Sequence, residues 1–209
     1  MLCGVYTVAS GMSYAHRVIA FDYDNTITRD EQHNHTHGSM TEIDSIMGSQ
    51  ARLHKIRLLF HALQANNVVI LIVTFNQKPY VQSMLEKFGL LSCVTAIYDH
   101  HFIFKFVETI PCVSCRETNT NQAKQVFMLK YVAPAFHVDE KNMMLVDDQI
   151  TNLDHGLSEH CAILHVDKHQ TGYGVDDREI GIISDAFGLA AHSAVTSHHH
   201  PLRHRGSVR

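Results

Sequence analysis

Residues 68–75, VVILIVTF, form an unbroken apolar run that is rich in β-branched side chains. β-Branched residues favour strands, and a strand whose two faces are both apolar has to be covered on both sides. Strands of this kind occur in parallel sheets that carry helices on each face. The run therefore predicts a buried strand of a parallel sheet.

Further apolar runs and amphipathic segments alternate along the chain. Residues 41–66 carry apolar side chains three or four positions apart, which is typical of a helix with one buried face. Beyond this helix we expect strands at 17–21, 94–99, 143–148 and 161–166, a short extra strand at 102–110, and helices at 77–89, 121–132 and 150–159. The alternation of strands and helices predicts an α/β fold built on a doubly wound parallel sheet.

Length and composition describe a single soluble domain. The 209 residues suit one domain, which we expect to span 1–192, and the Ser-, His- and Arg-rich residues 193–209 indicate a disordered tail or a linker. The net charge of −4 argues against a nucleic-acid partner. No apolar stretch reaches transmembrane length, and residues 1–20 lack the features of a signal peptide. The five cysteines are an odd number in a domain too large to need disulfides. We therefore expect a cytoplasmic protein in a reducing compartment.

Acidic residues follow two of the expected strands. Asp22 and Asp24 come directly after the first strand, and Asp147 and Asp148 end the fourth. Carboxyl ends of parallel strands meet at one sheet edge, where ligands bind in open α/β folds. Carboxylates gathered at this edge suit Mg²⁺. The structural alternatives are that Asp147 or Asp148 caps the helix expected at 150–159, and that Asp22 and Asp24 lie in an acidic turn before a helix with Thr26 as its N-cap.

A possible anion site accompanies the acids. The strand at 68–75 ends in Thr74, whose hydroxyl lies before a helix N-terminus, where a phosphate oxygen can bind. A lysine would complete such a site. Lys124 lies near the start of the helix at 121–132 and is expected at this sheet edge, whereas Lys130, farther along, is expected in solvent.

With these elements in order, the chain resembles the haloacid dehalogenase (HAD) superfamily. The D-x-D-x-T motif matches Asp22, Asp24 and Thr26, and the strand ending in a hydroxyl matches Thr74. The third motif, a lysine about twenty residues before the last acidic motif, matches Lys124. The acidic pair after an apolar strand matches Asp147 and Asp148, with Asn152 as in a common variant. The resemblance covers about residues 16–168, and Asn25 stands where a glycine is commoner.

The resemblance implies hydrolysis of a phosphate monoester through an aspartyl-phosphate. Asp22 would be the nucleophile, and Asp24 would be the general acid and then the general base. Mg²⁺ would be held by Asp22, the backbone carbonyl of Asp24 and Asp147. The remaining positions divide between two roles: Thr74, Asn76 and Lys124 would bind the phosphate oxygens, and Thr26, Asp148 and Asn152 would support the ligands from behind.

The intervals between the motifs bear on the substrate. One loop and one long helix fill 22–74, and a helix, one or two strands and a loop fill 74–124, so neither interval holds an independent cap domain. The resemblance therefore implies a three-layer, capless, HAD-like fold with an open site. An open site favours a phosphorylated protein or peptide, with phosphotyrosine weakly preferred. Alternatives are a small-molecule phosphatase for sugar phosphates or nucleotides, capped by a partner subunit, and a non-catalytic module that binds a phosphorylated ligand.

Two further patterns could bind metal. The alternating histidines of 33–37 and the pair Cys112 and Cys115 both have suitable side chains. No second C-x-x-C motif completes a zinc site. We interpret both patterns as ordinary loop residues.

Overall fold

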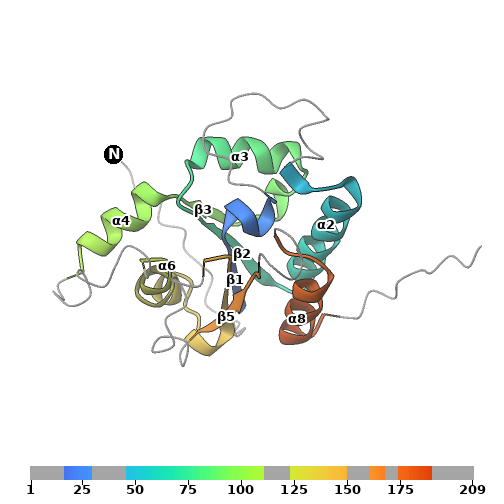
Figure 1. The fold of residues 1–209 in the computed structure, drawn as a ribbon. Helices are drawn as coiled ribbons and strands as arrows, with labels where there is room; N and C mark the ends of the chain where they lie inside the picture. The colour runs from blue at the N-terminus through green and yellow to red at the C-terminus, as the bar shows by residue number, and fades with distance from the viewer. Residues whose placement is uncertain (1–16, 30–45, 111–122, 150–160, 168–173, 190–209) are drawn as a thin grey trace, which may run out of the picture.

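The protein is an α/β sandwich around a five-stranded, all-parallel sheet (Figure 1). The computed structural model describes residues 17–29, 46–110, 123–149, 161–167 and 174–189. The strands are β1 (Arg17–Phe21), β2 (Val68–Val73), β3 (Ala96–Tyr98), β4 (Met143–Asp147) and β5 (Ala162–His165), and their order across the sheet is β3-β2-β1-β4-β5. The α/β fold class and the parallel sheet expected from the sequence are confirmed.

Strand β1 lies at the centre of the sheet, and its register aligns the strand ends. Phe21 pairs with Ile72 of β2 and with Val146 of β4. The backbone N–H of Asp22 donates to the carbonyl of Val146 at 2.9 Å, which extends this pairing one residue past β1. The side chains that follow β1, β2 and β4 therefore meet at one edge of the sheet.

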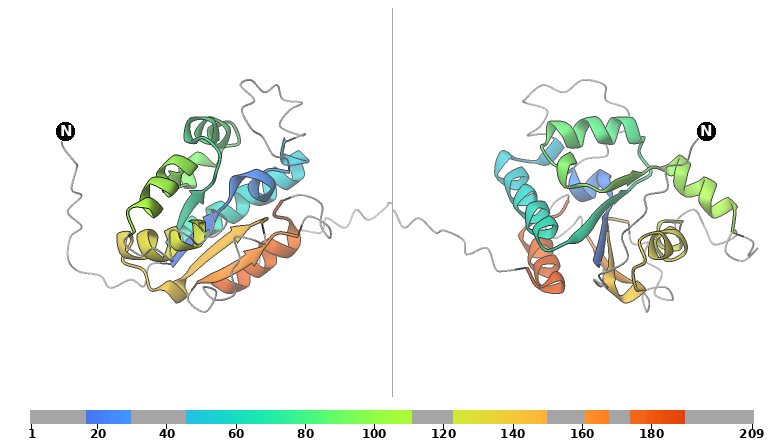
Figure 2. Two further views of the ribbon diagram at one scale, coloured as in Figure 1. Left: turned by 60° about the vertical axis from the view of Figure 1, so that its left-hand side comes forward. Right: turned by 180° about the vertical axis from the view of Figure 1, so that it is seen from behind.

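Helices cover both faces of the sheet, as Figure 2 shows from two further sides. On one face of the sheet, the buried side chains of Ile19, Phe21 and Ile70 pack in a core with α2 (Gln50–Ala65), α3 (Lys78–Lys87) and α8 (Asp177–Phe187). The other face, with Val18, Ala20 and Leu71, packs against α4 (His100–Glu108) and α6 (Ala123–Phe127). Shorter helical segments are η1 (Tyr23–Ile27), η2 (Leu91–Cys93), η4 (Met128–Val132), α7 (Ala133–Ala135) and η5 (Glu140–Asn142). The fold has the expected three layers.

Helix α2 begins later than the apolar periodicity predicts. The predicted helix spans 41–66, but Gly48 has a positive φ of 78° and Ser49 is extended, so α2 begins at Gln50. The Ser49 side chain accepts a hydrogen bond from the backbone N–H of Arg52, which satisfies a free amide at the helix start. Residues 41–45 lie outside the described part of the chain.

The short extra strand predicted at 102–110 is wrong, because residues 102–108 belong to α4 and residues 109–110 follow it. Asp99 caps the helix and accepts a hydrogen bond from the backbone N–H of Phe102 at 3.0 Å. Phe102 and Phe106, one helical turn apart, both pack against Phe127 of α6. The alternation of Phe102, Phe104 and Phe106 suggested a strand, whereas packing against α6 selects the helical spacing.

The expected elements do not include helix α8, although its buried Ile183 and Phe187 lie four residues apart. It begins with a capping box, in which Asp176 and Glu179 exchange hydrogen bonds with each other's backbone, and ends before Gly188 in the left-handed conformation. The helix expected at 150–159, the histidine run, the cysteine pair and the tail at 193–209 lie outside the described residues. Within the described segments, no helix is both long enough and apolar enough to cross a bilayer.

Candidate functional site

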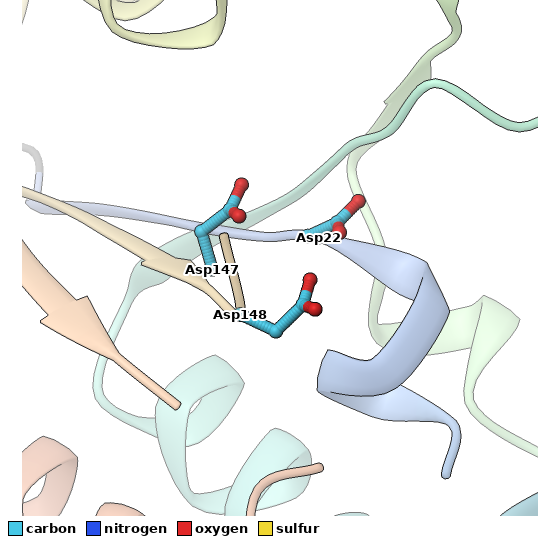
Figure 3. Close-up of side chains that lie close together, drawn as sticks. All are labelled: Asp22, Asp147 and Asp148. Carbon is cyan, nitrogen blue, oxygen red and sulfur yellow. The ribbon is translucent and has the colours of Figure 1, made fainter. Parts of the chain in front are cut away.

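Three aspartates gather beyond the ends of β1 and β4. Asp22 follows β1, Asp147 ends β4, and Asp148 comes next in the chain. Figure 3 shows the three carboxyl groups together, and one oxygen from each lies within 4.8 Å of the others. All three residues are buried. Since adjacent parallel strands are about 4.8 Å apart, the pairing of β1 with β4 sets the spacing between Asp22 and Asp147.

Lys124 of α6 binds two of these carboxylates. Its Nζ lies 2.8 Å from Oδ1 of Asp22 and 2.8 Å from Oδ2 of Asp147. The lysine is 1% exposed, and its Nζ also lies 4.8 Å from the centre of the Phe75 ring. Lys130, in contrast, is exposed, as the sequence analysis expected. Helix α6 therefore brings a buried ammonium to the aspartates.

The site holds more negative than positive charge. Burial raises the pKa of Asp22 from 3.8 to about 8; Lys124 opposes this rise, and the nearby carboxylates of Asp147 and Asp148 add to it. Burial alone would lower the pKa of Lys124, but Asp22 and Asp147 raise it above its ordinary value, so the ammonium stays charged. Three carboxylates around one ammonium favour the uptake of a proton or of a cation.

The aspartate oxygens fit a hard divalent cation. Mg²⁺ prefers carboxylate oxygens and retains several waters, so it does not need a complete cage of protein ligands. The sequence analysis placed Asp148 behind the ligands, whereas the structure places its carboxylate beside those of Asp22 and Asp147. The reason is a turn after β4, in which the backbone N–H of Gln149 donates to Oδ1 of Asp147 at 2.8 Å. Asp148 therefore leaves the strand alternation and is a candidate ligand.

Asp24 lies in a separate hydrogen-bonded group that includes Asn76 and Thr74. The side-chain N–H₂ of Asn76 donates to the two carboxylate oxygens of Asp24, at 3.3 and 3.2 Å. The backbone N–H of Asn76 donates to the Thr74 hydroxyl at 3.0 Å, and both Thr74 and Asn76 are buried. The amide of Asn76 therefore orients the Asp24 carboxylate, and its expected contact with a phosphate stays a prediction.

The turn between Asp22 and Thr28 places Asp24. Asn25 adopts the left-handed conformation with φ of 57°, which Asn tolerates better than most residues. Its backbone N–H donates to the Thr28 hydroxyl at 3.2 Å, and this hydroxyl donates to the carbonyl of Tyr23 at 3.2 Å. Thr28 thus closes the turn from inside. The sequence reasoning missed Thr28, because a threonine after an acidic motif has no distinctive pattern.

Arg52 of α2 is a second residue that sequence reasoning missed. It is 5% exposed, and its guanidinium donates to the backbone carbonyls of Thr26 and Ile27, which follow the acidic motif. Thr26 itself is fully buried, and its carbonyl also accepts from the backbone N–H of Val175 at 2.8 Å. A signal was available, since Arg52 lies on the apolar face of α2 four residues before Ile56. Asn152 lies outside the described residues.

Comparisons with known proteins give structural likenesses alone. No family model and no curated protein matches the chain. The chain is similar in structure to an uncharacterized protein from Corynebacterium glutamicum, with 20% identity, a TM-score of 0.47, and coverage of 83% of this chain and 96% of that one.

Two further similar structures are phosphatases of 3-deoxy-D-manno-octulosonate 8-phosphate. The enzyme from Moraxella catarrhalis, in complex with magnesium, phosphate and KDO, has 10% identity and a TM-score of 0.46, with 83% of this chain and 87% of that chain covered. The cobalt-bound enzyme from Haemophilus influenzae has 10% identity and a TM-score of 0.46, with 83% and 90% covered.

Proposed function

We propose that the protein is a Mg²⁺-dependent phosphomonoester hydrolase of the HAD type, working through an aspartyl-phosphate. The observation that carries this proposal is the buried Asp22, which lies 2.8 Å from Lys124 and next to two further carboxylates. A purely structural role explains this arrangement poorly, because three buried carboxylates with one lysine leave negative charge uncompensated. A cation and a phosphate-transfer reaction account for it.

In the first half-reaction, an oxygen of Asp22 attacks phosphorus and the bond from phosphorus to the leaving oxygen breaks. Asp24 donates a proton to that oxygen, so the alcohol leaves neutral. In the second half-reaction, Asp24 takes a proton from water, whose oxygen attacks phosphorus. The bond to Asp22 breaks, and inorganic phosphate leaves with the carboxylate restored.

The surrounding residues make this chemistry possible. Lys124 opposes the rise in the pKa of Asp22, and its ammonium would also attract the phosphate oxygens. Thr74 offers a buried hydroxyl at the end of β2, and Asn76 orients Asp24. Mg²⁺, when held by Asp22, Asp147 and the backbone carbonyl of Asp24, with Asp148 as a further candidate, would neutralise the phosphate charge.

For the substrate, we propose a phosphorylated protein or peptide, with phosphotyrosine preferred weakly. In support, the helices and strands of the described segments all belong to one layered unit, which leaves the strand ends without a second domain among those segments. A site that is not enclosed admits a phosphate on a macromolecule. A sugar phosphate or nucleotide, enclosed by a partner subunit, is the alternative outcome of the test below.

The test is hydrolysis of p-nitrophenyl phosphate, a phosphopeptide panel and sugar phosphates, each with Mg²⁺ and with EDTA. We expect activity with Mg²⁺, its loss with EDTA, and its loss in Asp22→Asn. Asp177→Asn is the matched control, because Asp177 is an exposed carboxylate that pairs with Lys55 away from the site. Full activity of Asp22→Asn would refute the nucleophile. A preference for sugar phosphates of more than about tenfold, or about 1.4 kcal/mol in the barrier, would refute the protein substrate.

A further inference from the structure

Arg52 gathers backbone carbonyls from three separate segments. Its Nη1 donates to the carbonyl of Ile27 at 2.9 Å and to that of Met47 at 3.0 Å. Its Nη2 donates to the carbonyl of Thr26 at 3.2 Å, and its Nε donates to that of Val175 at 2.8 Å. Four of the five N–H donors of a guanidinium are thus used on carbonyl oxygens. One side chain of α2 thus joins the turn after β1, the segment just before α2 and the segment before α8.

This buried arginine is held mainly by peptide dipoles. Burial and the charge of Arg29 lower its pKa from 12.5 to about 10, against the opposing effect of Asp176 and Glu179. The guanidinium nevertheless remains charged at neutral pH. Burying a cation costs free energy unless its donors are satisfied, so its place beneath the turn requires these carbonyls to stay in position.

The segment around Gly174 closes on the same carbonyls. Gly174 has a φ of 82°, and a Cβ there would come within 2.9 Å of the Thr26 carbonyl oxygen and 2.7 Å of that of Thr28. The backbone N–H of Val175 donates to the Thr26 carbonyl, which Arg52 also binds. The outer side of the turn is therefore held by two contacts, the Arg52 side chain and the backbone of Gly174 and Val175.

We propose that Arg52 is a positioning residue that holds the Asp24 carboxylate in place for proton transfer. The carbonyls of Thr26 and Ile27 lie two and three residues after Asp24 in one continuous turn. Thr28 closes this turn from inside, and Arg52 fixes it from α2. Without Arg52 the turn keeps its internal bonds and the bond from Val175 to Thr26, but it loses its attachment to α2. This inference rests on the proposed function, since it assigns the proton donor to Asp24.

The test measures how the rate depends on the leaving group. p-Nitrophenolate leaves readily without a proton, whereas phenolate and alkoxides need one, so a misplaced acid slows phenyl and alkyl phosphates most. We expect Arg52→Lys and Arg52→Met to lower kcat for phenyl phosphate at least about tenfold more than for p-nitrophenyl phosphate, a difference of about 1.4 kcal/mol. Asp24→Asn should show the same dependence, and Arg52→Met should add little to it.

Arg57 provides a matched control on the same helix. Its Nε donates to the carbonyl of Phe88 at 2.6 Å, at the end of α3, so Arg57→Lys removes an arginine–carbonyl bond that does not reach the turn. We expect equal small losses for all substrates in this variant. In Arg52→Ala, millimolar guanidinium should restore the phenyl phosphate rate more than the p-nitrophenyl phosphate rate, and urea at the same concentration should restore neither.

Each result decides one question. A wild type without phosphatase activity refutes the proposed function itself. An active wild type whose Arg52 variants lose equal activity on all substrates refutes the positioning role alone. If Arg52→Met does not fold, Arg52→Lys carries the test, because it keeps the charge. An Arg52→Lys protein that also fails to fold assigns Arg52 to stability and overturns the inference.

Discussion

Replacing Asp22 by Asn should inactivate the protein and at the same time stabilise its metal-free form. Asn cannot attack phosphorus as a carboxylate does, so we expect kcat to fall at least about a thousandfold, or roughly 4 kcal/mol in the barrier. The carboxylate removed is one of three buried ones that share a single lysine. Removing its charge relieves the repulsion from Asp147 and Asp148, while Lys124 keeps its 2.8 Å contact with Asp147.

The size of the stabilisation follows from the pKa of Asp22. Burial and the neighbouring carboxylates raise it from 3.8 to about 8 in the folded protein. Between these two pH values the folded state holds a proton that the unfolded state has released, so wild-type stability falls as the pH rises through this window. A shift from 3.8 to about 8 corresponds to at most roughly 6 kcal/mol, of which we expect about 2–4 kcal/mol after local relaxation.

The assay is urea unfolding without metal at pH 4, 6 and 8.5, for wild type, Asp22→Asn and the exposed control Asp177→Asn. The Asp22 variant should gain stability over wild type as the pH rises, and the gain should nearly vanish near pH 4. Asp177→Asn should stay within about 0.5 kcal/mol of wild type at every pH. With excess Mg²⁺ at pH 8.5, the wild type should be more stable than Asp22→Asn, because Mg²⁺ binds the three wild-type carboxylates more tightly than the two that remain in the variant. An Asp22 variant no more stable than metal-free wild type at pH 8.5 would refute the charge imbalance.

Two further predictions concern the lysine and the glycine that surround this site. Lys124→Met should lower the free energy of unfolding by about 3–5 kcal/mol at neutral pH, because it leaves buried carboxylates without their cation. Lys130→Met, at an exposed position, should change this free energy little. Equal denaturant midpoints for the two variants would contradict the buried ion pairs. Gly174→Ala should lose about 1–3 kcal/mol, because its positive φ strains a Cβ that also approaches two carbonyls. Gly181→Ala lies within α8, where an added Cβ meets open space, so this variant should gain about 0.5–1 kcal/mol in stability. Thermal melts compare the two glycine variants, and equal melting midpoints would refute the packing argument.

The central part of the fold and of the site could be predicted because it depends on sheet geometry. Asp22 and Asp147 lie together because both end apolar strands that pair in parallel, and parallel strands share their carboxyl edge. Lys124 rather than Lys130 reaches the acids because it lies at the start of α6, whereas Lys130 lies six residues farther along, in η4. The positions of Asp22 and Asp147 therefore follow from where two apolar runs end, and the choice of lysine follows from its place near the start of a helix.

The errors occur where contacts between distant residues decide. Phe102, Phe104 and Phe106 alternate like a strand, but Asp99 caps a helix there and Phe127 packs against one of its faces. The role of Arg52 depends on carbonyls 25 and 123 residues away in the chain, which no local pattern encodes. Asp148, whose supporting role stays a prediction, has its carboxylate beside the other two because of a turn after β4.

The central position of β1 also affects how the chain folds. Its neighbour β4 pairs Val18 with Met143, so the two strands that carry Asp22 and Asp147 are separated by about 125 residues of chain. Contacts of such long sequence separation form late and make folding slow. During synthesis, Asp22 emerges from the ribosome long before Lys124 and Asp147 exist. Asp22 therefore becomes buried, and its pKa rises, only once the sheet is nearly complete. A partly synthesised chain lacks the assembled cluster of Asp22, Lys124 and Asp147.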